Sequence, residues 1–115
     1  MSAAGRSFDP AATEVLSSDA RRSPKLIGLF LRQVPIEFAN IEAALARDDR
    51  AAWKDVAHKL KGSCRAVGAS RMAESCEKLE RSPDVPTAQA SHALLSDQFL
   101  LVKELLEVEL ARSVG

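Results

Sequence analysis

Aromatic residues are scarce in this chain of 115 residues, which has one Trp, four Phe and no Tyr. Its core must therefore be mostly aliphatic, although 46% hydrophobic residues are enough for one domain. Glycine and proline, at five each, are too few for a collagen-like or loop-rich chain. No apolar run approaches the roughly 20 residues of a membrane span, and the N-terminus lacks the apolar stretch of a signal peptide. We therefore expect a soluble, cytoplasmic protein that does not insert into membranes.

An excess of charge is also lacking, because Lys plus Arg and Asp plus Glu number 16 each. A balanced chain has no general attraction for nucleic acid, so we expect none as a partner. The two cysteines, Cys64 and Cys76, have no further Cys or His ligands at the spacing of a zinc site. We expect two buried thiols and no metal site, and nothing in the sequence indicates a disulfide.

Helical periodicity dominates the sequence, and no segment alternates in the manner of a strand. The predicted helices are Ser23 to about Arg47, about Asp49 to Gly68, about Ala69 to Ser82, and about Asp84 to Ala111. Pro35 is expected to kink the first of them.

The last helix is apolar over a wide face that consists of two stripes. One stripe is Leu95, Phe99, Val102, Leu106 and Leu110, and the other is Leu94, Leu101, Leu105 and Val108. Such a face must be covered from two sides, and a short helix from Pro10 to Leu16, capped by Asp9, could supply the second cover.

Short connections between long amphipathic helices define the predicted fold class. It is an all-α protein, an antiparallel up-down four-helix bundle with a short extra N-terminal helix. We expect residues 1–7 to form a disordered tail and residues 8–115 to form one domain. A monomer is the expected state, although the wide apolar face leaves dimerisation open.

The polar face of the second helix places a histidine among cations. At spacings of three or four residues it carries Lys54, His58, Lys61, Gly62 and Arg65, with Lys59 beside them. Gly62 is informative, because a glycine inside a helix costs about 1 kcal/mol relative to alanine and this one lies off the apolar face. A side chain at position 62 would project back over residue 58, so glycine leaves open space above the imidazole.

This arrangement suits phosphoryl transfer. A neutral imidazole is a competent nucleophile, and Lys61 and Lys59 could stabilise the charge on the phosphoryl oxygens. The chain has no glycine-rich phosphate loop and no second domain for ATP. We therefore expect a relay that is loaded by another protein, and not an enzyme.

The residues around His58 read AHKLKGSC, and they are followed by Val67-Gly68-Ala69, Met72, Cys76 and Leu79-Glu80. From Ala57 to Glu80 this order and spacing resembles the HPt (histidine-containing phosphotransfer) domain family. The resemblance implies that His58 accepts the phosphoryl group, that Lys61 stabilises it and that Gly62 gives access. It also implies a helical bundle whose partners are receiver domains of response regulators or hybrid sensor histidine kinases. No cofactor of its own is expected, since the Mg²⁺ for transfer would be held by the acidic pocket of the receiver.

Partner docking has several candidate residues around His58. Leu29 and Ile36 lie off the main apolar stripe of the first helix, and Lys54 and Arg65 flank the histidine. The competing interpretation is that Leu26, Leu29 and Ile36 pack against the N-terminal or the last helix. His92 has no basic neighbour or glycine like those of His58, so it is expected to be an ordinary surface or boundary residue.

Two other functions remain open. The chain could be a helical adaptor that binds a receiver or kinase domain without carrying phosphate, although an adaptor would not need the set of His58, Lys61 and Gly62. A hydrolase with His58 as general base is disfavoured, because the sequence shows neither a nucleophile nor an acid partner for it.

Overall fold

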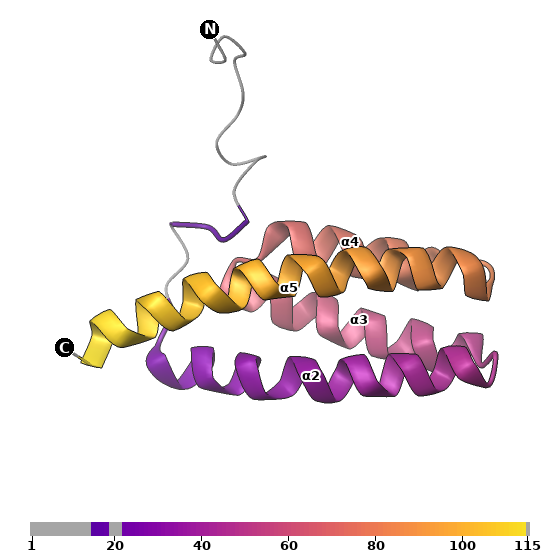
Figure 1. Cartoon of the computed structure of the whole chain (residues 1–115), viewed down its shortest axis with the longest axis horizontal. Coiled ribbons are helices and arrows are strands. Elements are labelled where there is room, and N and C mark those ends of the chain that lie inside the picture. Colours follow the sequence, from indigo (N-terminus) through magenta and orange to yellow (C-terminus); the bar gives the residue numbers. More distant parts are fainter. Residues whose placement is uncertain (1–14, 19–21, 115) are drawn as a thin grey trace, which may run out of the picture.

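The computed structural model describes residues 15–18 and 22–114, and all regular structure within these ranges is helical. The helices are α2 (Pro24–Ala46), α3 (Arg50–Val67), α4 (Ser70–Arg81) and α5 (Val85–Val114). They lie side by side, and each chain reversal takes only two or three residues (Figure 1). Each helix packs mainly against two others, so that α2, α3, α4 and α5 form a closed ring. The predicted antiparallel four-helix bundle is confirmed.

Local signals set the helix ends. The Ser23 hydroxyl accepts a hydrogen bond from the Leu26 amide at 3.0 Å, which caps α2. Asp49 caps α3 in the same way, by accepting from the Ala52 amide at 3.0 Å. Gly68 ends α3 with a φ of 80°, a left-handed conformation that costs glycine little. These caps explain why the boundaries could be predicted from the sequence alone.

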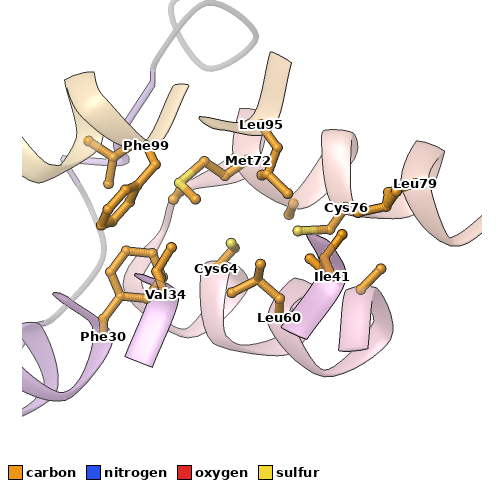
Figure 2. Packing of buried hydrophobic residues seen from close by; sticks show 14 of the residues in the cluster. Phe30, Val34, Ile41, Leu60, Cys64, Met72, Cys76, Leu79, Leu95 and Phe99 are labelled. Atoms are coloured by element: carbon orange, nitrogen blue, oxygen red, sulfur yellow. The ribbon is translucent and has the colours of Figure 1, made fainter. Parts of the chain in front are cut away.

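The core is aliphatic and sulfur-containing, with one aromatic cluster between α2 and α5. Cys64 and Cys76 are both free and fully buried, as predicted, and Figure 2 shows their side chains among those of Leu60, Ile41 and Met72. The hydrogen bond between the Cys64 and Cys76 thiols and the burial of the site both raise the pKa of the Cys64 thiol. The aromatic rings of Phe30, Phe38 and Phe99 meet edge to face, with centroids 5.6 to 6.1 Å apart.

The prediction of a face on α5 that is covered on two sides is wrong for the described residues. Its first stripe is buried or half-buried, but the large side chains of the second stripe are exposed: Leu94, Leu101, Leu105 and Val108. The reason is that α5 packs mainly against α4 and α2, and that α4 has 12 residues whereas α5 has 30. Of the predicted opening helix, only Val15 and Leu16 are described, and they are not helical but pack against the core. The rest of that helix and the predicted tail lie outside the described residues.

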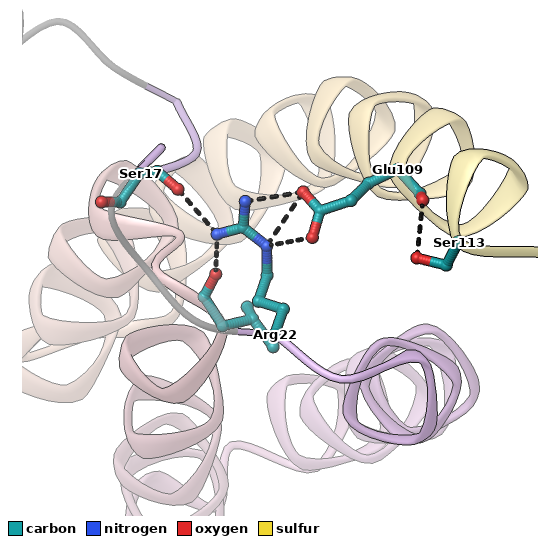
Figure 3. A network of polar contacts seen from close by, with 5 residues as sticks. Ser17, Arg22, Glu109 and Ser113 are labelled. Carbon is teal, nitrogen blue, oxygen red and sulfur yellow. Dashed lines mark hydrogen bonds and ion pairs between the residues drawn. The ribbon is translucent and has the colours of Figure 1, made fainter.

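A buried arginine joins the beginning of α2 to the ends of α3 and α5. The side chain of Arg22 is 5% exposed, and its guanidinium donates to the carbonyls of Ser17 at 2.7 Å and Val67 at 2.9 Å. It also forms a bidentate ion pair with Glu109, whose shortest N···O distance is 2.7 Å (Figure 3). The Arg22 guanidinium holds the pKa of the Glu109 carboxyl below its usual range. This contact closes the end of the bundle at which α3 terminates.

Candidate functional site

His58 lies in the middle of α3, and its side chain points into solvent. Its immediate neighbour Ala57 and the nearby Leu60 are buried in the core, which leaves position 58 on the outer face of the helix. The imidazole is 66% exposed. The ring is therefore accessible to another protein while its backbone is held by the core.

Glu80 on α4 binds the Nδ1 side of this ring. Its Oε2 lies 3.0 Å from His58 Nδ1. An ionised carboxylate only accepts hydrogen bonds, so Nδ1 must carry the proton that it donates to Glu80. In the neutral imidazole the lone pair then resides on Nε2, the other ring nitrogen. No described residue bonds to Nε2, so the lone pair of this nitrogen is accessible from solvent.

Lys61 shares the same carboxylate. Its Nζ donates to Glu80 Oε1 at 2.9 Å, so that Glu80 bridges the lysine and the histidine. The hydrogen bond from Lys61, with a smaller contribution from His58, lowers the pKa of Glu80 below its usual value. Glu80 therefore stays ionised to a lower pH than an ordinary glutamate. Lys61 is only 14% exposed, because α4 packs against its side of α3, and the prediction that it faces solvent is wrong.

Gly62 leaves space beside the histidine. A Cβ placed on this residue would have no atom within 4 Å outside its own stretch of helix. Packing therefore gives no reason for glycine, although alanine would form a better helix. The structure has the open space that the sequence argument requires.

Lys59 lies on the other side of His58 from Lys61. Its ammonium is 3.8 Å from Asp55, one turn earlier on α3, and both side chains are well exposed. Such a pair is weak and leaves the lysine free to move. The structure does not bring Lys59 into the cluster of His58, Lys61 and Glu80.

The predicted docking residues surround the histidine on both flanks. Leu29 and Ile36 on α2 are 49% and 55% exposed, so they do not pack on the last helix, and most of the predicted N-terminal helix lies outside the described residues. Leu26 does pack against the core. Leu29 also lines an apolar groove of about 240 Å³ between α2 and α3, with Leu26, Phe30, Gln33, Ser63, Ala66 and Val67. On the α4 side, Lys54 lines a polar hollow. Arg65 lies 3.8 Å from Glu77.

Sequence reasoning missed the role of Glu80. The signal was present in the Leu79-Glu80 pair, because Leu79 belongs to the buried stripe of α4 and the next residue must lie at its edge. His92, expected to be a surface or boundary residue, is almost fully covered, with 8% of the residue exposed. Its Nε2 is 3.1 Å from Glu42, and its ring packs edge-on against Phe38.

The described residues were also compared with the requirements of a metal site and of a membrane span. They contain no group of three or more His, Cys, Asp or Glu side chains arranged to bind a metal ion. None of the described helices combines the length and the apolar character that a membrane span requires.

Fold and site together define a small helical module with one accessible, carboxylate-bound histidine. The Hpt domain family model matches residues 25–111, which include all of α3 and α4. The chain belongs to this family of phosphotransfer modules in two-component phosphorelays, which have no kinase activity of their own. A search of curated proteins and a search of solved structures gave no match.

Proposed function

We propose that His58 accepts a phosphoryl group on Nε2 from the aspartyl phosphate of a receiver domain and passes it to the aspartate of another. The observation that carries this proposal is the orientation of the ring. Glu80 occupies Nδ1 at 3.0 Å, which leaves Nε2 in solvent. Gly62 keeps the approach to the ring open. Receiver domains of response regulators or hybrid sensor histidine kinases are the partners that suit this chemistry.

The transfer balances without a proton leaving the ring. The Nε2 lone pair attacks phosphorus, the N–P bond forms, and the bond between phosphorus and the aspartyl oxygen breaks to leave a carboxylate on the receiver. The ring becomes cationic while Nδ1 keeps its proton. Glu80 stabilises this charge as it develops, because its ionised carboxylate already accepts from Nδ1. The return transfer reverses each step and restores the neutral imidazole.

Lys61 serves two purposes in this scheme. Its contact with Oε1 keeps Glu80 ionised before the phosphoryl group arrives. Its charge also lies on the same helix, one turn from His58, where it attracts the phosphoryl oxygens. Lys59, on the opposite side of the ring, adds a second and more mobile cation.

The receiver supplies what this chain lacks. We expect the Mg²⁺ for the transfer to be held by the receiver's acidic pocket, in the cytoplasm where such relays operate.

The exposed Leu29 and Ile36, together with the apolar groove between α2 and α3, provide the surface on which the receiver docks. One copy of the chain contains every residue of the site, so a monomer is sufficient.

The test is phosphotransfer from a panel of phosphorylated receiver domains, with Mg²⁺, to the wild type, His58→Gln and His92→Gln. We expect acid-labile, base-stable label on the wild type and on His92→Gln but none on His58→Gln. Binding of a receiver without label on any form would instead establish the helical adaptor. Equal labelling of the wild type and His58→Gln would place the accepting residue elsewhere.

A further inference from the structure

Positive charge is concentrated on the helix that carries His58. Helix α3 has one acidic residue, Asp55, and five cations: Arg50, Lys54, Lys59, Lys61 and Arg65. In α5 the balance is reversed, and its acidic residues Asp97, Glu104, Glu107 and Glu109 outnumber Lys103 and Arg112. A chain without net charge therefore presents a cationic face around its histidine.

Part of this charge lies in a polar hollow of about 400 Å³ between α3 and α4. The hollow is lined by Arg50, Lys54 and Lys61 from α3 and by Glu77, Glu80 and Arg81 from α4. Glu80 joins the hollow to the histidine, because it bonds to His58 as well as to Lys61.

Both carboxylates of the hollow are already neutralised. Glu80 pairs with Lys61 and His58, and Glu77 pairs with Arg81 at 2.7 Å and with Arg65 at 3.8 Å. Neither Arg50 nor Lys54 has a charged partner among the residues that the structure describes. Their two positive charges are therefore available to a molecule outside the chain.

The stability of α3 does not explain the cation at position 50. Arg50 is the first residue of the helix, and its first turn contains no acidic residue. The N-terminus of a helix carries a partial positive charge, so a cation there is unfavourable and an acidic residue would stabilise the helix. The position of Arg50 favours an interaction with something other than its own helix.

We infer that the cationic hollow docks an acidic patch on the surface of the receiver domain, beside its phosphorylated aspartate. This inference rests on the proposed function. Helical spacing places the hollow on the α4 side of His58 and the apolar groove on the α2 side. Two contacts of different chemistry on opposite flanks orient the receiver about the axis through Nε2. Unpaired charges also act beyond contact distance and accelerate association at low salt.

The experiment compares two double variants with the same change in net charge. Arg50→Glu with Lys54→Glu reverses the charge of two cations in the hollow. Lys103→Glu with Arg112→Glu is the matched control on α5. All four of these side chains are exposed. Each variant is tested with receiver domains phosphorylated by acetyl phosphate, at low and high salt. A second assay uses phosphoramidate, which labels an accessible imidazole without a docked protein: its P–N bond breaks, the Nε2–P bond forms and ammonia leaves.

We expect the reversed hollow to lower kcat/KM for the receiver by about tenfold or more at low salt, with kcat nearly constant. High salt should remove the difference, and the control variant should behave as the wild type. Labelling by phosphoramidate should stay within about twofold of wild type, since association is the step affected.

Three outcomes would overturn the inference. A kcat/KM that is unchanged in the reversed variant would show that the hollow does not contact the receiver. An equal loss of phosphoramidate labelling would mean that the cations act on the phosphoryl group itself, and an equal loss in the α5 control would mean that only net charge matters. Failure of the proposed function looks different, because the wild type and the α5 control would then take no label from any phosphorylated receiver.

Discussion

Substitutions of Gly62 separate the stability of α3 from access to His58. Alanine is favoured over glycine in a helix interior by about 1 kcal/mol. A Cβ at this position meets no atom within 4 Å, so no steric penalty offsets that gain. Gly62→Ala should therefore raise the free energy of unfolding by about 1 kcal/mol. For a domain of this size, the gain corresponds to an increase in Tm of about 4–8 °C.

Gly28 provides the matched control on α2. A Cβ there would lie 3.3 Å from Nη1 of Arg32, the far end of a flexible side chain that can move aside. Gly28→Ala should therefore give a similar or slightly smaller gain in Tm. Circular dichroism melts of both variants measure the difference, and phosphotransfer by Gly28→Ala should match the wild type.

A long side chain at position 62 should have the opposite effect on function. Side chains on a helix lean toward its N-terminus, so the glutamine of Gly62→Gln would lie over the His58 ring. Displacing the incoming phosphoryl group by about 1 Å is enough to slow transfer by about 100-fold. The variant should nevertheless be at least as stable as the wild type. A lower Tm for Gly62→Ala would refute the premise that the fold does not need glycine, and wild-type transfer by Gly62→Gln would refute the access argument.

Three further predictions concern the contacts around this site and in the core. Glu80→Gln should slow transfer at least tenfold, because the developing charge on the ring loses its ionised acceptor. Since the pKa of Glu80 is lowered in the folded state, its ionised contacts stabilise the fold above the usual glutamate pKa and are lost as the pH falls through the lowered value. The difference in urea midpoint between wild type and Glu80→Gln should accordingly shrink in acid, and a constant difference would contradict this reasoning. Arg22→Ala should lower the free energy of unfolding by about 2–3 kcal/mol, because it leaves the Val67 carbonyl and Glu109 without their donor. A thermal melt checks this, and an unchanged Tm would show that the contact is dispensable. Cys64, whose pKa is raised by its thiol partner and by burial, should resist iodoacetamide in the native protein and react in urea. Mass spectrometry would detect native-state alkylation if this expectation were wrong.

The sequence was sufficient for the four helices of the bundle and for the side of α3 on which His58 lies. Helix caps such as Ser23 and Asp49 bind amides three residues later, so they can be predicted from residues that are close together in the sequence. Periodicity placed Ala57 and Leu60 in the core, and the exposure of His58 follows from the same rotation per residue.

Predictions failed where burial depends on how far a neighbouring helix extends. Lys61 lies on the polar side of its own helix, yet the packing of α4 covers it. Leu101 and Leu105 look like core residues within α5, yet the ring of helices leaves them exposed. A single helix does not specify the lengths and positions of its neighbours, so periodicity alone could not have predicted these outcomes.

The sequence by itself therefore determined the elements, the four-helix class and the accessible histidine. Only the tertiary structure decided what holds that histidine. Glu80 is 22 residues from His58 in the chain, and Arg22 is 87 residues from Glu109. Such pairs meet because the packing of the whole core sets the register between antiparallel helices. A shift of one turn between α3 and α4, about 5.4 Å, would separate the carboxylate from the ring while every local signal remained the same.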